Sequence, residues 1–191
     1  MKSLKRLTAL IAAVAAVVAL AAPSMASASR IEASKGKLAP AGTTLTMSGP
    51  MNISSSLYGQ LGGECYWTVN EQLTKNDGIT VEGVPTTPGT SIGCTNNGNP
   101  MPITDIKFEK FYTSVSGRGT VNLSFTSEFS GAKPLICRWT GTGVPFTYQL
   151  GGSGIAFTSA AGLSASPGAC GTGKLNGYLE LKIGSLPVIF N

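Results

Sequence analysis

Hydrophobic and polar residues alternate with a period of two along much of the chain, which indicates β-strands with one buried face. In the clearest run, Val121, Leu123 and Phe125 alternate with polar residues. After residue 28, no window has a helical period that glycine or proline leaves unbroken. We therefore predict about nine or ten short strands, with the strongest candidates at 44–53, 64–69, 79–84, 103–115, 121–126, 135–140, 146–150, 155–157 and 179–183.

Turn signals separate these runs. The string Asn76-Asp77-Gly78 favours a tight turn, and the glycine-rich segment 151–154 is typical of a hairpin connection. Within 103–115 the alternation changes phase near Glu109 and Lys110, which predicts a bulge or a turn at that point.

The first 28 residues have the pattern of a secretory signal peptide. Basic residues at positions 2, 5 and 6 precede an apolar run at 7–22, and the small residues that follow match what signal peptidase accepts. The apolar run is short and alanine-rich for a membrane anchor, and no later segment resembles a membrane-spanning helix. We expect export, cleavage near residue 27 or 29, and a single mature domain over 29–191.

The four cysteines lie after the signal segment, and an even number in an exported chain indicates two disulfides. The string Cys-x-Trp-Thr begins at Cys65 and again at Cys137, 72 residues later, and further cysteines follow at Cys94 and Cys170. Spacing alone leaves three pairings open. A duplicated unit would most simply carry its own bridge, which gives Cys65–Cys94 and Cys137–Cys170. Each tryptophan, two residues from its cysteine, should share its strand face and pack against the disulfide.

Together these features favour an all-β fold, namely an antiparallel β-sandwich of the immunoglobulin or jelly-roll kind, held by two disulfides. An eight-stranded outer-membrane barrel is the second architecture, because the strands alternate up to the C-terminus. Against it stand the shortness of the predicted strands and an aromatic content of 7% without girdles.

The composition removes most catalytic chemistry. The chain has no histidine, which excludes Ser-His-Asp and Cys-His catalysis and histidine-ligated zinc. Asp77 and Asp105 are too isolated for a calcium loop. A glycosidase needs only paired carboxylates, but the glutamates lie in no recognisable motif, and a solvated strand face accounts for most of them. The glutamates considered are Glu64, Glu71, Glu82, Glu109, Glu128 and Glu180. We predict no enzyme activity, no catalytic residue, no metal and no cofactor.

The charge distribution does not favour a nucleic-acid partner. Charged residues make up 12% of the chain, and of its 14 basic residues three lie in the signal segment, which leaves 11 against 9 acidic ones. These 11 are scattered and are not interleaved with aromatic residues, whereas nucleic-acid binding needs a basic cluster.

The segment 38–50 (LAPAGTTLTMSGP), the exported form and the Gly/Ser/Thr-rich β-chain with four spaced cysteines resemble the secreted protein activators of alkane oxidation from Gram-negative bacteria. The resemblance spans most of the mature chain and holds no catalytic motif. It implies an extracellular, non-enzymatic, surface-active protein that makes long-chain hydrocarbons available to cells. Its partner would be a hydrophobic interface or the cell surface, to which a low-charge β-domain could adsorb through apolar patches.

Two other functions stay open at the level of sequence. A structural or adhesive module of the envelope or biofilm matrix would self-associate through strand edges, which sparse charge protects little. A carbohydrate-binding module would need aromatic side chains aligned on one exposed face. The candidates for that face are Tyr58, Tyr112, Tyr148 and Tyr178.

Overall fold

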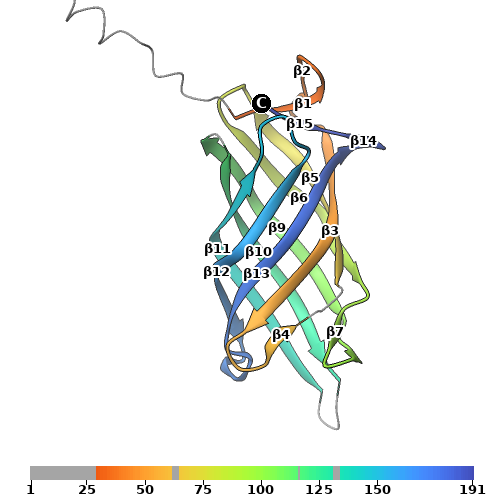
Figure 1. Ribbon diagram of the computed structural model, residues 1–191, viewed down its shortest axis with the longest axis vertical. Coiled ribbons are helices and arrows are strands. Elements are labelled where there is room, and N and C mark those ends of the chain that lie inside the picture. Colours follow the sequence, from red (N-terminus) through yellow and green to blue (C-terminus); the bar gives the residue numbers. More distant parts are fainter. Residues whose placement is uncertain (1–28, 62–64, 116, 131–133) are drawn as a thin grey trace, which may run out of the picture.

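Eight strands of 11 to 14 residues, each running most of the length of the molecule, dominate the structure (Figure 1). The computed structural model describes residues 29–61, 65–115, 117–130 and 134–191, so the predicted signal segment 1–28 lies outside the described residues. The long strands are β3 (Thr44–Ser55), β5 (Tyr66–Asn76), β6 (Val81–Ile92), β9 (Ile103–Val115), β10 (Arg118–Phe129), β11 (Leu135–Tyr148), β12 (Gly154–Ser166) and β13 (Thr172–Ile183).

These strands form a closed barrel. Consecutive strands pair antiparallel in the order β3-β5-β6-β9-β10-β11-β12-β13. The last strand then returns to the first, with β13 pairing to β3 from Gly173↔Ser55 to Lys182↔Thr46. The all-β class and the antiparallel pairing are confirmed, but the predicted β-sandwich is wrong, because one sheet closes on itself instead of packing against a second sheet.

Bulges within the strands give the physical reason for this difference. Glycine-rich segments that predicted the ends of short strands lie inside long ones. The strand β11 joins the predicted runs 135–140 and 146–150, and its register with β12 shifts between Gly141 and Thr147. The strand β6 likewise contains Pro85 and Pro88, and its register with β9 shifts between Gly83 and Gly89. Bulges bend a strand and increase its twist, which lets a small barrel close.

The apolar residues of the long strands face the barrel interior. In β3, for example, Leu45, Met47, Met51 and Ile53 are buried, and the residues between them are mostly threonine, serine and asparagine. The bulkiest buried side chains include Trp67, Trp139, Phe108, Phe111 and Phe125. The outer wall is therefore largely polar, which is the reverse of an outer-membrane barrel, whose apolar band faces outward.

Short elements lie at both ends of the barrel (Figure 1). One end, here called the terminal end, carries β1 (Ile31–Ser34), β2 (Lys37–Leu38), β14 (Leu186–Pro187) and β15 (Ile189–Phe190). The opposite end, here called the disulfide end, carries β4 (Gly59–Leu61), β7 (Thr95–Asn96), β8 (Asn99–Pro100) and the 3-10 turn η2 (Gly168–Cys170). The pairing of β1 with β15 brings the N-terminal and C-terminal strands together.

The two disulfides join Cys65 to Cys94 and Cys137 to Cys170, which confirms the pairing expected from a duplication. Each bond connects the start of one strand, β5 or β11, to the segment that follows the next strand, β6 or β12. In the closed order of eight strands, β5 and β11 are four places apart. The two repeated units therefore occupy opposite sides of one barrel.

The turns and the bulge predicted from local sequence are also confirmed. The Asp77 carboxylate accepts hydrogen bonds from the backbone N–H groups of Ile79 and Thr80, at 2.9 and 2.8 Å. Residues 149–153 connect β11 to β12. The register of β9 with β10 passes from Lys110↔Asn122 to Phe108↔Leu123, which leaves Glu109 as the extra residue of a bulge.

Candidate functional site

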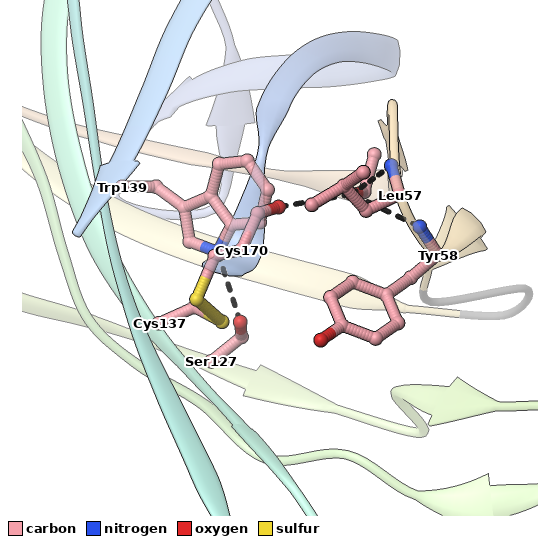
Figure 2. The surroundings of a disulfide bond; sticks show 7 residues. Leu57, Tyr58, Ser127, Cys137, Trp139 and Cys170 are labelled. Carbon is pink, nitrogen blue, oxygen red and sulfur yellow. Dashed lines mark hydrogen bonds between the residues drawn. A yellow bond between two sulfur atoms is a disulfide. The ribbon is translucent and has the colours of Figure 1, made fainter. Parts of the chain in front are cut away.

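The two Cys-x-Trp strings meet inside the barrel. The ring of Phe125 lies between the two tryptophans, with ring centroids 5.2 Å from Trp67 and 6.0 Å from Trp139. The Trp67 indole N–H lies 3.1 Å from the Cys65 sulfur. The Trp139 indole N–H donates to the Ser127 hydroxyl at 2.9 Å, beside the second disulfide (Figure 2). The predicted packing of the tryptophans against the disulfides is thus confirmed, and this cluster belongs to the core.

Glu71 is the one candidate carboxylate that the barrel interior holds among the described residues. It lies on the inward face of β5 in line with Trp67, Val69 and Leu73, and neither carboxyl oxygen has a hydrogen-bond partner. Desolvation raises the pKa of Glu71 to about 9, so the group is protonated at neutral pH. The solvated strand face expected for most of the glutamates is wrong at this position. The burial of Glu71 could have been predicted from the sequence, because Glu71 is four residues from Trp67 and alternate residues of a strand share one face.

The other candidate carboxylates of the described residues are dispersed over the outer wall. The Glu180 carboxylate pairs with Lys182 at 2.8 Å, and that of Glu109 accepts a hydrogen bond from the Ser124 hydroxyl at 3.1 Å. Glu64 lies outside the described residues. Within the described ranges, no three His, Cys, Asp or Glu side chains come together as metal ligands. The same ranges contain no helix with the length and apolar character needed to cross a membrane.

Buried polar contacts fix the N-terminal segment to the terminal end of the barrel. The Tyr148 hydroxyl donates to the Ser29 hydroxyl at 2.8 Å, and Ser29 also hydrogen-bonds the Thr113 hydroxyl. The Tyr148 ring stacks on Phe190 with 4.4 Å between centroids. Tyr148 therefore tethers the chain ends to the wall and offers no ring to a ligand.

The four tyrosines considered for carbohydrate binding do not share an exposed face. Tyr58 lies at the disulfide end and packs on Phe129, Tyr112 is half-buried on β9, and Tyr148 is buried. Tyr178, on the outer face of β13, is 44% exposed. These four residues therefore do not form the aligned aromatic surface that the sequence suggested, and Tyr178 is the one of them that lies exposed on the outer wall.

Exposed apolar side chains gather instead at the disulfide end, in a set here called the disulfide-end rim. Its exposed members are Leu57, Tyr58 and Ile136, and the half-buried Phe129 and Leu135 pack between the rim and the core. Leu57 is 61% exposed and Ile136 is 50% exposed. The rings of Tyr58 and Phe129 are 5.0 Å apart, and Phe129 pairs with Leu135 across the β10–β11 ladder. Ile136 lies on the outer face of the same strand end, opposite Glu128.

The second disulfide holds this rim in place. The Ser55 hydroxyl accepts hydrogen bonds from the backbone N–H groups of Leu57 and Tyr58, at 3.1 and 3.2 Å. The same hydroxyl donates to the Cys170 carbonyl at 3.0 Å (Figure 2). The disulfide thus fixes the turn that presents Leu57 and Tyr58. The rim was not predicted from the sequence, because Leu57 and Tyr58 lie in a turn, where the period-two alternation of strands gives no information.

Apolar residues at the terminal end are arranged differently. Leu38, Ile79, Leu150 and Leu186 are exposed, but they come from four separate connections. Lysines accompany them, with Lys35 and Lys37 beside Leu38 and Lys75 before Ile79. The terminal end is therefore mixed in character.

Comparison of the chain with known protein families, with characterised proteins and with solved structures found no match.

Proposed function

We propose that the protein is an exported, non-enzymatic, surface-active protein that adsorbs to hydrophobic interfaces and promotes the use of hydrophobic substrates such as alkanes. The disulfide-end rim carries this proposal. It places exposed apolar side chains at one end of a barrel whose wall is largely polar. The contrast between the apolar side chains of this rim and the polar wall gives the molecule the polarity needed to sit at an oil–water boundary.

The energetics of the rim are adequate for adsorption. Full burial of a leucine- or isoleucine-sized side chain contributes roughly 1.5–3 kcal/mol, and Leu57 and Ile136 retain half or more of their surface to bury. The turn bearing Leu57 is already ordered by Ser55 and the Cys137–Cys170 bond. Adsorption therefore costs little further conformational entropy at this turn.

Export and the absence of catalysis have separate support. Disulfides form and persist in oxidising compartments, and both bonds are integral to this barrel. Among the described residues, the candidate carboxylates are dispersed or, at Glu71, buried without a hydrogen-bond partner. A structural or adhesive role through strand edges loses its basis, because each of the eight long strands is paired on both sides.

Growth of a deletion strain of the source organism tests the proposed function. We expect slower growth on hexadecane and unchanged growth on succinate. The wild-type chain should restore growth, whereas Leu57→Ser/Ile136→Ser should not. The matched control, Ile79→Ser/Leu186→Ser, removes two equally exposed side chains at the terminal end and should restore growth. Normal growth of the deletion strain on hexadecane would refute the role in alkane use.

A further inference from the structure

A groove on the outer wall of the barrel, next to Tyr178, has features that the interfacial function does not use. Tyr178 lies opposite Ala156 across the β12–β13 ladder. A Cβ added at Gly154 would lie only 2.0 to 2.4 Å from the hydroxyl end of the Tyr178 ring. The ring therefore lies along the backbone of β12 in the space that Gly154 leaves open. Because Tyr178 is 44% exposed, it presents ring surface to solvent.

Two adjoining hollows extend from this ring across the wall. The first, of about 380 Å³, is lined by Thr147, Gln149, Gly152, Gly154, Ala156 and Tyr178, with Tyr148 at its edge. The second, of about 370 Å³, shares Thr147 and Ala156 with the first and continues to Thr120, Pro145 and the charged Arg118. The pairing of β11 with β12 stops at Thr147↔Ala156 and resumes at Gly141↔Leu163. Thr147 and Ala156, which line both hollows, are thus the last paired residues before this gap in the ladder.

The lining chemistry identifies a class of ligand. Gly154 leaves room for the hydroxyl end of the Tyr178 ring, and the threonine hydroxyls and the Gln149 amide supply neutral hydrogen-bonding groups beside it. In the first hollow no lining residue is charged. A pyranose ring has an apolar face and a rim of hydroxyls, so it matches a flat aromatic ring bordered by neutral polar groups. We propose that this groove, called here the Tyr178 groove, binds a neutral hexopyranose polysaccharide.

The binding site is separate from the disulfide-end rim. The Tyr178 groove is built on the wall from β11, β12 and β13, whereas the rim comes from the turn after β3 and from the ends of β10 and β11 that lie at the disulfide end. A substitution in the groove can therefore abolish polysaccharide binding without affecting interfacial adsorption, and a substitution in the rim can do the reverse.

Affinity electrophoresis of the purified protein in gels containing dextran, pullulan, laminarin or hydroxyethylcellulose tests the proposal. We expect at least one of these neutral glucans to retard the wild-type protein. Tyr178→Ala should weaken that retardation at least tenfold, and Thr147→Val, which removes a hydroxyl with little change of shape, should weaken it in the same gel. Tyr66→Ala is the matched control, because Tyr66 is 42% exposed on β5 outside the groove. It should behave as the wild type.

Tyr178→Leu keeps a bulky side chain over Gly154 and so separates loss of the ring from loss of packing. It should be folded, as judged by its near-ultraviolet circular dichroism, and should bind as weakly as Tyr178→Ala. Two results would overturn the proposal: wild-type protein that none of the four glucans retards, or a folded Tyr178→Leu protein that is retarded as strongly as the wild type.

Discussion

At the residue scale, Glu71 makes the stability of the barrel depend on pH. Its pKa is about 9 in the folded protein, against 4.5 ordinarily. The folded protein therefore holds the Glu71 proton more tightly than the unfolded chain does. The contribution of Glu71 to the free energy of unfolding is complete below pH 4.5 and is lost as the pH rises toward 9. By pH 7 the loss amounts to about 3 kcal/mol. Buried without a hydrogen-bond partner, the carboxyl group must stay protonated or destabilise the core.

We expect the free energy of unfolding of the wild-type protein to fall between pH 6 and 9, and that of Glu71→Gln to stay nearly constant. Urea unfolding across this range measures the difference. The chain has no histidine, and its four cysteines are in disulfides, so the side chains that usually titrate in this range are missing. Equal pH dependence in the two proteins would contradict the assignment to Glu71.

Gly49 is a second residue whose identity the fold dictates. A Cβ at this position would lie 2.1 Å from the backbone carbonyl oxygen of Tyr178, at the seam where β3 and β13 close the barrel. Gly49→Ala must push two backbones apart, and we expect a loss of about 2–4 kcal/mol in the free energy of unfolding. At Gly168, a Cβ would meet no atom within 4 Å. Gly168→Ala should therefore change stability by less than about 0.5 kcal/mol, and equal losses in the two variants would contradict the account of the seam.

At the element scale, each disulfide ties together one strand pair of the barrel. The bonds close segments with sequence separations of 29 and 33 residues, and the chain-entropy model gives about 3–4 kcal/mol for loops of this length. Replacing both cysteines of either pair with alanine should lower the free energy of unfolding by that amount. Only loss of Cys137–Cys170 should also loosen the turn at Leu57, because the Cys170 carbonyl accepts the hydrogen bond of the Ser55 hydroxyl that holds this turn. Limited proteolysis distinguishes the two variants, and equal cleavage near Leu57 would contradict this role.

Local sequence was sufficient for some elements and insufficient for others. The period-two alternation located strand cores such as 121–126, and the Asn76-Asp77-Gly78 turn formed as predicted, because both depend on neighbouring residues. The strand ends were not predictable in the same way. Gly141 and Gly143 would normally end a strand, yet β11 continues through them because β10 pairs with it on either side of the bulge, at Val121↔Val144 and Leu123↔Gly141. Strand length, and with it the choice between sandwich and barrel, depends on this tertiary pairing.

At the scale of the whole molecule, the repeat of Cys-x-Trp-Thr gave the disulfide pairing and anticipated two related halves. It did not indicate that the halves share a single closed sheet, because that depends on the pairing of β13 with β3, whose partner residues are 118 to 136 positions apart in the chain. The disulfide-end rim likewise forms only when the whole barrel is folded. Its residues come from the turn after β3 and from two distant strands, so no single segment of sequence contains it.

The central claim, that the protein acts at a hydrophobic interface through its disulfide-end rim, is tested most directly by pendant-drop tensiometry of the purified exported protein at a hexadecane–water interface. We expect the wild-type protein to lower the interfacial tension. At the same concentration, Leu57→Ser/Ile136→Ser should lower it much less, while Ile79→Ser/Leu186→Ser at the terminal end should match the wild type. A wild-type protein that leaves the tension unchanged, or a rim variant that lowers it as much as the wild type, would contradict the claim.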